Sequence, residues 1–386
     1  MSVTAAQGFR AAGVTAGLKP SGKPDVAVVV NDGPSHTAAG VFTTNRVAAA
    51  PVRWSRQVLT DGRADAVVLN SGGANAATGH AGFQDAHRTA EHAAEALGVS
   101  AGDVVVCSTG LIGERLPLDT LLAGVDAAAA GLAEDGGADA ALAIMTTDTV
   151  PKEAQASGEG WTVGGMAKGA GMLAPGMATM LCVVTTDADL PAAALRAALE
   201  EAVRTTFNRV DSDGCMSTND TVVLLASGAS GVAPEPTQFG AALHAVCADL
   251  ARQLVGDAEG AGHDVLIRVV NASDEDAGEA VARAVSRSNL LKTAIFGQDP
   301  NWGRVISAVG TVPEEVAPFD ADALDVSFNG VQVCRAAGVG DSRAGVDLSG
   351  REVVIEIDLH AGDAVVELWT NDLTHDYVHE NSAYST

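Results

Sequence analysis

Paired cysteines, aromatic side chains and lysine are all scarce in this sequence of 386 residues. Aromatic residues make up only 4% of the chain, so its core must be built mainly from valine, leucine, isoleucine and alanine. The five cysteines are odd in number, lie far apart and form no C-x-x-C pair. This pattern argues against a disulfide framework or a zinc site and favours reduced thiols in the cytoplasm. Lysine contributes only five of the 23 basic residues, which makes each lysine a candidate for a specific role.

Long apolar runs and an excess of positive charge are also missing. No run of 18 apolar residues occurs, so we expect no membrane span, and residues 1–19 lack the apolar segment of a signal peptide. The net charge of −26 repels phosphate backbones and anionic membranes, which argues against nucleic-acid or membrane partners. G-x-x-x-x-G-K-[S/T] does not occur, so the sequence does not support a P-loop enzyme. G-x-S-x-G occurs only at residues 98–102, between a predicted helix and a predicted strand and not on the strand-to-helix turn of a nucleophile elbow, so the sequence does not support a serine hydrolase either.

The composition that remains, 47% hydrophobic and 19% charged, is typical of a globular chain long enough for two core-forming units. A stretch rich in glycine, proline and alanine at 227–237 predicts a boundary between an α/β unit, 1–235, and an α+β unit, 236–386. Apolar runs predict strands at 26–30, 66–69, 104–107, 180–186 and 221–225. Apolar periodicity predicts three helices: one at 83–97, one that begins after a cap at Asp189, and one that runs from a cap at Thr237, just after the boundary, to Gly256.

Two hairpins are predicted in the second unit, beside a strand at 265–270 and a helix at 276–288. The first joins strands 326–328 and 331–333 through Asn329-Gly330, a pair that suits the positive φ angles of a type I′ turn. The second joins 353–359 and 364–369 around Gly362.

A glycine-rich segment, 168–179, carries most of the functional information. Its G-x-G-x-x-A run, Gly169 to Ala174, superficially matches a dinucleotide fingerprint, with Asp189 twenty residues further on. That motif must open a helix, whereas Pro175 and Gly176 would break one at once. We therefore expect a tight turn that presents Thr179 at the start of a buried strand.

Strain at a peptide bond before threonine is what an N-to-O acyl shift requires. After such a cleavage, the new α-amine has a reference pKa of about 7.7–8.0 and can act as the base for its own hydroxyl. From these residues alone, a threonine in such a turn is more often structural than nucleophilic, so the purely structural interpretation of Thr179 stays open. His375 and His379 stand four residues apart, as on zinc-binding helices, but no third ligand is evident nearby and no metal is predicted.

The segment Lys168-Gly-x-Gly-Met-x-x-Pro-x-Met-Ala-Thr179 resembles the processing motif of the ornithine acetyltransferase (glutamate N-acetyltransferase) family. Further blocks of that family occur in the same order and cover essentially the whole chain. They are Asn70-Ser-Gly-Gly-Ala-Asn75, Ser108-Thr-Gly-Leu-Ile-Gly113, Met145-Thr-Thr-Asp-Thr149-x-Pro-Lys152, Ser217-Thr-Asn-Asp-Thr221, Gly297-Gln-Asp-Pro-Asn-Trp-Gly-Arg304, Asp372-Leu-Thr-His-Asp-Tyr-Val378 and Glu380-Asn-Ser-Ala-Tyr-Ser-Thr386.

The resemblance implies a role for particular residues. Thr179 would be the nucleophile, freed by self-cleavage between Ala178 and Thr179, and Thr109 and Gly110 would form the oxyanion hole. Lys168 would bind a substrate carboxylate or lower the pKa of the amine, and Glu259 would meet the substrate's amino group. The implied substrate-binding set is Thr146, Thr147, Lys168, Thr179, Glu259, Asn381 and Thr386. The family usually continues Gly-Ala-Thr-Lys after the glutamate, whereas this sequence reads Gly260-Ala261-Gly262-His263.

The resemblance also implies the architecture and the reaction. The expected fold is a layered αββα sandwich with an N-terminal-nucleophile-like site, plus a smaller C-terminal α+β unit. Fragments 1–178 and 179–386 would assemble as an α2β2 heterotetramer in the cytoplasm. The enzyme would pass acetyl from N2-acetylornithine to glutamate in arginine biosynthesis, without a metal or cofactor; whether acetyl-CoA is a second donor is left open.

Two alternatives stay open on the sequence alone. A self-processing N-terminal-nucleophile hydrolase or aminopeptidase would share the cleavage but pass the acyl group to water. A non-catalytic or nucleotide-binding α/β protein would use Thr179 only as a turn residue.

Overall fold

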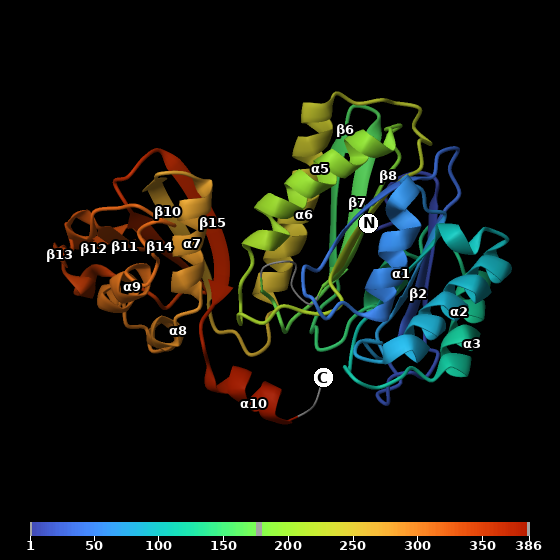
Figure 1. Cartoon of the computed structure of the whole chain (residues 1–386), viewed down its shortest axis with the longest axis horizontal. Helices are drawn as coiled ribbons and strands as arrows, with labels where there is room; N and C mark the ends of the chain where they lie inside the picture. Colours follow the sequence, from blue (N-terminus) through green and yellow to red (C-terminus); the bar gives the residue numbers. More distant parts are fainter. Residues whose placement is uncertain (1, 175–179, 384–386) are drawn as a thin grey trace. The chain divides into compact units, whose positions relative to one another are not determined.

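The computed structural model describes residues 2–174 and 180–383 and divides the chain into two compact units (Figure 1). The first comprises Met1–Asn208 and Cys215–Asp257, and the second comprises Arg209–Gly214 and Ala258–Tyr384. The boundary therefore follows helix α6 (Pro236–Gly256) and does not fall at 235/236, where composition suggested it. Helix α6 belongs to the first unit because its buried face packs on strands β6 and β7 of that unit.

The first sheet of the first unit has the strand order β1-β2-β4-β5. Strands β4 and β5 run parallel, and helix α2 connects them, whereas the other neighbours are antiparallel. The predicted strands and the predicted helix of this region are confirmed. The bounds are β1 (Phe9–Val14), β2 (Val26–Asn31), β4 (Ala66–Asn70), β5 (Val104–Ser108) and α2 (Gly79–Leu97).

The second sheet has the order β3-β9-β8-β7-β6, with β8 and β9 parallel and α5 between them in sequence. Strand β7 forms although it contains Gly164 and Gly165. A Cβ on Gly164 would lie 2.3 Å from the carbonyl oxygen of Ser2, so only glycine fits there. The bounds are β3 (Thr37–Phe42), β6 (Lys152–Gly158), β7 (Trp161–Lys168), β8 (Leu181–Thr186), β9 (Thr221–Ala226) and α5 (Ala192–Thr205).

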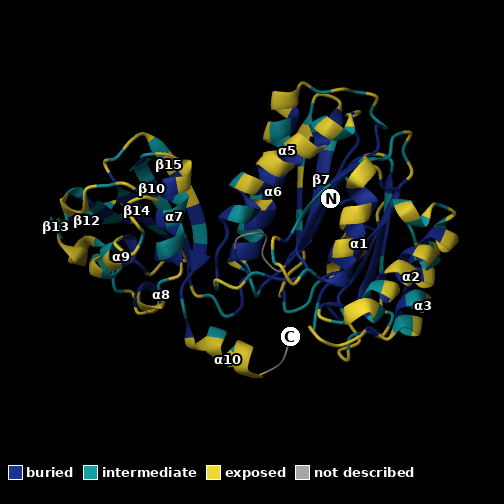
Figure 2. Cartoon of the chain, viewed as in Figure 1, coloured by how far each residue is buried: buried dark blue, intermediate teal, exposed yellow. Residues whose placement is uncertain are grey.

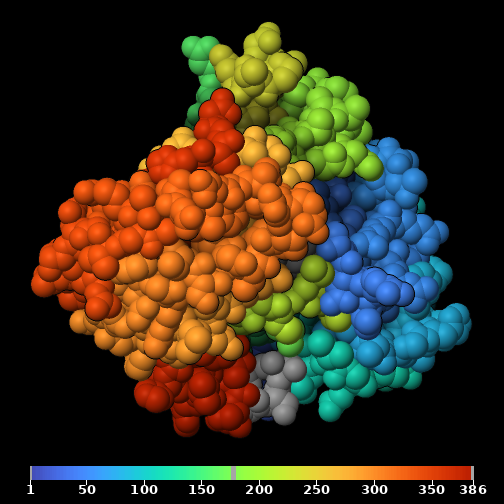
Figure 3. Space-filling view, turned by 60° about the vertical axis from the view of Figure 1, so that its left-hand side comes forward, coloured from blue at the N-terminus to red at the C-terminus, as the bar shows by residue number. Residues whose placement is uncertain are grey.

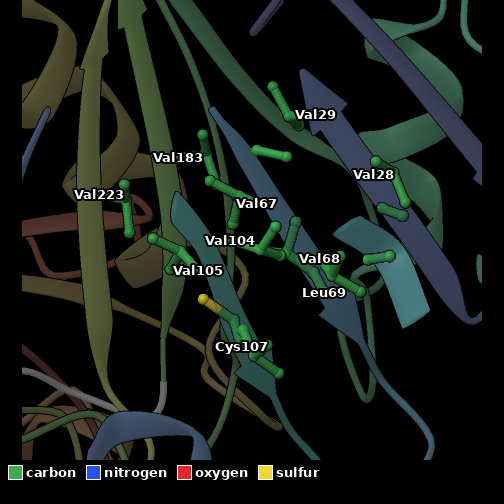
Figure 4. Packing of buried hydrophobic residues seen from close by; sticks show 14 of the residues in the cluster. Val28, Val29, Val67, Val68, Leu69, Val104, Val105, Cys107, Val183 and Val223 are labelled. Atoms are coloured by element: carbon green, nitrogen blue, oxygen red, sulfur yellow. The ribbon is translucent and has the colours of Figure 1, made fainter. Parts of the chain in front are cut away.

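The two sheets pack face to face through a core rich in valine, as Figure 4 shows. Val67 and Val105 of the first sheet belong to the same buried cluster as Val183 and Val223 of the second. Helices α1 (Ala50–Val58), α2 and α3 (Leu118–Ala130) pack on the first sheet, α5 and α6 pack on the second, and α4 (Gly137–Ala143) packs on β1 and β2. The strands are largely buried, and the helices expose one face (Figure 2). The predicted αββα sandwich is confirmed.

The helix caps expected at Asp189 and Thr237 are not used. Helix α5 has Pro191 at its N-cap, and α6 begins at Pro236 after Glu235, with no side-chain cap hydrogen bond at either N-cap. In α6, Pro236 stands in the first turn, where its ring fixes φ at a helical value and its missing N–H needs no partner. Among the described residues, no helix is both long and apolar enough to cross a bilayer.

The second unit, orange to red in Figure 3, contains one sheet of order β13-β12-β11-β14-β10-β15. The Asn329-Gly330 hairpin is confirmed, with φ angles of 47° and 82° at the two turn residues. The second predicted hairpin is wrong: β14 and β15 do not pair, because β10 lies between them, parallel to β14 and antiparallel to β15. The strands are β10 (Asp264–Ala272), β11 (Asp325–Phe328), β12 (Val331–Arg335), β13 (Gly338–Val339), β14 (Glu352–Asp358) and β15 (Ala364–Asn371).

Four α-helices belong to the described part of the second unit. They are α7 (Glu275–Ser286), α8 (Asn289–Phe296), α9 (Trp302–Val309) and α10 (His375–Ala383). The side chain of Asp274 caps α7 by accepting a hydrogen bond from the N–H of Ala277 at 2.8 Å. In the G-Q-D-P-N-W-G-R block, Asn301 caps α9 through the N–H of Arg304, so this block has a structural use.

Candidate active site

The glycine-rich segment leaves a buried strand and does not open a helix. Strand β7 ends at Lys168, residues 169–174 contain no helix, and Leu173 forms an isolated bridge with Met216. The dinucleotide fingerprint requires a helix immediately after the strand to bind a pyrophosphate, so this geometry does not support a nucleotide site. Ala178 and Thr179 lie outside the described residues, and Met180 directly precedes β8.

Asp148 is the centre of a buried ionic network at the end of β7. Its Oδ1 accepts hydrogen bonds from Lys152 Nζ at 2.7 Å and from the N–H of Gly169 at 2.6 Å. Its Oδ2 accepts the N–H of Thr146 at 2.9 Å and lies 3.8 Å from Lys168 Nζ. One carboxylate therefore joins three predicted features: the Thr146 segment, the Lys168 ammonium and the start of the glycine-rich segment.

The charges around Asp148 are matched although they are buried. Lys152 is 0% exposed and also contacts Asp257 Oδ2 at 2.6 Å, and Asp257 accepts the N–H of Thr149 at 3.0 Å. Burial alone would raise the pKa of Asp148, but the ammonium groups of Lys168 and Lys152 and the hydrogen bonds outweigh it and hold that pKa well below its ordinary value. Asp148 is therefore ionised at neutral pH and favours a charged Lys168.

Lys19 adds a third ammonium group to this region. Its Nζ donates to the carbonyl oxygen of Met145, the residue before Thr146, at 2.6 Å, and to that of Pro24 at 2.7 Å. Partial burial lowers its pKa to about 8, although the charge of Asp25 opposes the shift. Four of the chain's five lysines are buried or half-buried, since Lys292 of the second unit is also enclosed. The scarcity of lysine was thus an informative signal.

The predicted oxyanion hole lies on a constrained loop after β5. Thr109 is buried, donates its N–H to the carbonyl of Asn70 at 2.9 Å and accepts the N–H of Gly73 at 3.0 Å. Gly110 has a φ of +130°, and a Cβ at this position would lie 2.8 Å from the nitrogen of Gly73. A side chain is therefore excluded twice, by the backbone conformation and by the close approach of Gly73.

Asn219 ties this loop to the block that precedes β9. Its Nδ2 donates to the carbonyls of Ala74 at 2.6 Å and of Ser108 at 2.7 Å. Ser108 Oγ donates in turn to Asn70 Oδ1 at 2.5 Å. Three blocks far apart in sequence, 70–75, 108–113 and 217–221, therefore meet at one place in the first unit. Fixed backbone of this kind is what a preorganised oxyanion hole requires.

Two of the predicted substrate-binding residues meet in the second unit. Asn381 on α10 donates from Nδ2 to Glu259 Oε2 at 3.0 Å. The departure from the family pattern, His263, supports this loop: its Nδ1 lies 2.8 Å from Asp372 Oδ2, and Asp372 Oδ1 accepts the N–H groups of Gly262 and His263. Gly262 and His263, which stand where the family usually has Thr-Lys, are therefore both hydrogen-bonded to Asp372, and this fixes the backbone that follows Glu259.

The predicted residues fall into three groups. Thr109, Gly110, Thr146, Thr147 and Lys168 belong to the first unit, and Glu259 and Asn381 belong to the second. Ala178, Thr179 and Thr386 lie outside the described residues. Sequence reasoning assigned no role to Asp148, Lys152, Asn219 or Asp220, although all four stand inside recognised blocks. Their place in those blocks was the available signal, and their burial is visible only in the structure.

The chain is similar to known proteins over almost its whole length. A model of the ArgJ family matches residues 10–386. The arginine biosynthesis bifunctional protein ArgJ of Streptomyces coelicolor is 64% identical over 386 residues, which is 100% of each chain, and that of Bifidobacterium longum is 56% identical, also with 100% of each chain covered. A solved ornithine acetyltransferase complexed with ornithine, from Mycobacterium tuberculosis, is 58% identical and covers 47% of this chain and 96% of its own, with a TM-score of 0.45.

The chain belongs to the ArgJ family, because the family model spans almost its whole length and full-length relatives exceed half identity.

Proposed function

We propose that this protein is a glutamate N-acetyltransferase that moves acetyl from N2-acetylornithine to glutamate in arginine biosynthesis. Membership of the ArgJ family and the names of full-length relatives, which place them in arginine biosynthesis, support this proposal. The observation that carries it at the level of chemistry is the Asp148 network, which holds a buried ammonium, Lys168, at the start of the segment that leads to Thr179.

The proposed enzyme first cuts itself. The Thr179 hydroxyl attacks the carbonyl of Ala178, the amide becomes an ester, and water hydrolyses that ester to leave fragments 1–178 and 179–386. The new α-amine then serves as the base for the hydroxyl. The fragments would form an α2β2 heterotetramer in the cytoplasm.

The transfer has two half-reactions. In the first, Thr179 Oγ bonds to the acetyl carbon of N2-acetylornithine, and ornithine leaves with the proton. In the second, the amino group of glutamate attacks the acetyl-enzyme and releases N-acetylglutamate. One amide is exchanged for another, so the step needs no external energy source.

The described residues have matching roles in this scheme. The Thr109 hydroxyl and the Gly110 N–H would stabilise the developing oxyanion, where one such donor contributes about 3–4 kcal/mol. Lys168, held charged by Asp148, would bind the substrate carboxylate beside Thr146 and Thr147. Glu259, oriented by Asn381, would meet the substrate's amino group, and Thr386 would complete the site.

Initial-rate kinetics test the proposed transfer. Varying N2-acetylornithine at several fixed glutamate concentrations should give parallel double-reciprocal lines, since the acetyl-enzyme forms before glutamate binds. Denatured protein quenched without glutamate should carry one acetyl group on the fragment that begins at Thr179. Intersecting lines together with an unacetylated fragment would contradict the proposed intermediate.

Two further reactions share the same nucleophile. A self-processing hydrolase would release acetate from N2-acetylornithine without glutamate, at a rate equal to or above the transfer rate. Acetyl-CoA as a second donor is favoured by the word "bifunctional" in the names of the relatives. Release of CoA thiol in the presence of glutamate, abolished by Thr179→Ala, would extend the proposal to that donor.

A further inference from the structure

Asp220 is a buried acid of the first unit that has no part in the reaction described above. It is 0% exposed and stands between Asn219 and strand β9. Its Oδ1 accepts a hydrogen bond from the backbone N–H of Met180 at 3.1 Å. The carbonyl of Met180 accepts the N–H of Thr221, also at 3.1 Å. Met180 is therefore fixed on both sides of its backbone against the start of β9.

The second carboxyl oxygen of Asp220, Oδ2, is buried and completes no hydrogen bond of normal geometry to any residue in 2–174 or 180–383. Burial raises the pKa of Asp220 well above its ordinary value, although the Met180 N–H, the Ser217 hydroxyl, the charge of Lys168 on β7 and the Thr43 hydroxyl act in the opposite direction. A carboxyl group enclosed in this way is stable as the neutral acid, which holds a proton that it can donate.

Covalent geometry brings this acid close to the proposed cleavage site. Met180 is bonded directly to Thr179, and successive backbone nitrogens are three bonds, roughly 3 Å, apart. The backbone nitrogen that Asp220 contacts is thus the next one along the chain after the nitrogen of Thr179. The nitrogen of Thr179 is the leaving group of the N-to-O shift, and it must gain a proton to leave.

We propose that Asp220 delivers this proton to the Thr179 nitrogen during self-cleavage and then hydrogen-bonds the new α-amino group. The inference rests on the proposed cleavage between Ala178 and Thr179. In the step, the Thr179 oxygen bonds to the Ala178 carbonyl carbon, the bond from that carbon to nitrogen breaks, and the nitrogen takes the Asp220 proton. The proton from the threonine hydroxyl passes to Asp220, which regenerates the neutral acid before water hydrolyses the ester.

The test is the rate of self-cleavage of newly synthesised chains, followed on denaturing gels during cell-free translation. Asp220→Asn keeps the size of the side chain and its oxygen acceptor for Met180, but it cannot donate a carboxylic proton. It should slow cleavage at least about 100-fold while the chain folds. Asp220→Glu, which restores the carboxyl group, should recover part of the rate.

Asp187 supplies the matched control. It is 2% exposed, follows the other end of β8, and accepts the N–H groups of Gln7 and Thr162. Asp187→Asn therefore makes the same chemical change in a similarly buried, backbone-bonded aspartate, and should cleave at the wild-type rate. Wild-type cleavage by Asp220→Asn, or equal slowing by both variants, would overturn the proposal.

A second measurement decides the matter if Asp220→Asn does not fold. The cleavage rate of the unmodified chain should fall as the pH rises through the raised pKa of Asp220, because only the protonated carboxyl group supplies the proton. A rate that stays constant or rises over this range would overturn the assignment to Asp220. If the unmodified chain is never cut, the proposed function itself fails. If the unmodified chain is cut and Asp220→Asn is not, the proposed role of Asp220 is supported.

Discussion

Asp148 interacts with more of the candidate site than any other single side chain described above, and its role can be separated from simple ion pairing. Asp148→Asn removes the negative charge 3.8 Å from Lys168 Nζ and weakens the anchor of Gly169. We expect kcat/KM for acetyl transfer to fall about 100-fold, since misplacing a binding group by about an ångström has effects of this size.

Asp257→Asn is the control for Asp148. Asp257 pairs with the same Lys152, at 2.6 Å, but the interactions described for it involve neither Lys168 nor Gly169. Both variants should lower the midpoint of thermal unfolding, because each leaves Lys152 with a single buried carboxylate. Only Asp148→Asn should lose most of its activity. Equal losses of activity would mean that the network acts only through stability.

Gly110 offers a sharper test of the oxyanion loop. In Gly110→Ala the new Cβ would lie 2.8 Å from the Gly73 nitrogen, so the loop must shift. We expect kcat to fall by about 10²–10³-fold, the cost of losing one oxyanion donor, with a smaller change in KM. The measurement is a steady-state assay of acetyl transfer on the purified variant.

Gly113→Ala, in the same loop, separates displacement from backbone strain. Gly113 also has a positive φ, +90°, but a Cβ there meets nothing within 4 Å. Both substitutions should cost about 1 kcal/mol in backbone conformation. If Gly113→Ala loses as much activity as Gly110→Ala, strain alone accounts for the effect, and the oxyanion role of Gly110 is not supported.

Among the elements, helix α6 decides where the first unit ends. Leu250 on this helix is fully buried, and its Cδ1 would lie 3.1 Å from a Cβ built on Gly165 of β7. Leu250→Ala should lower the free energy of unfolding by about 2–5 kcal/mol, as expected for a large cavity in a core. Urea unfolding followed by circular dichroism measures this change.

The control for Leu250 is the same substitution at an exposed leucine of the same unit. Leu142 on α4 is 42% exposed, so Leu142→Ala should change the free energy of unfolding by no more than about 0.5 kcal/mol. Similar, small effects at both positions would contradict the assignment of α6 to the core of the first unit.

At the scale of the whole molecule, the second sheet explains how a cut chain can stay folded. Cleavage after residue 178 would place β3, β6 and β7 in one fragment and β8 and β9 in the other. Strand β8 pairs with β7, and β9 pairs with β3, so strands of the two fragments are hydrogen-bonded to each other at two seams of one sheet.

The two fragments should therefore co-elute under native conditions and separate only in denaturant. Size-exclusion chromatography followed by denaturing gels tests this, with Thr179→Ala as the uncut reference. An α2β2 assembly would elute at about twice the chain mass of 38.8 kDa. Fragments that separate in native buffer would contradict the shared sheet, and a native mass of about 38.8 kDa would contradict the heterotetramer alone.

Local chemistry is what the sequence by itself determined. The Asn329-Gly330 turn, the buried strands and the helix at 83–97 follow from φ preferences and apolar periodicity, which neighbouring residues decide among themselves. The order of the recognised blocks likewise indicated the family and most residues of the candidate site, because such blocks are read along the chain and need no knowledge of long-range contacts.

Long-range pairing was decided only by the tertiary structure. Strand β10 lies between β14 and β15 and pairs with both of them. The short spacing between β14 and β15 in the sequence cannot reveal that a strand from elsewhere in the chain is inserted between them. Asn219 reaches Ala74, 145 residues away, and Asp148 reaches Gly169, 21 residues away. The buried pairing of Lys152 with Asp257, and the enclosure of Asp220, depend on which strands lie side by side, because burial and charge compensation are properties of the assembled sheets.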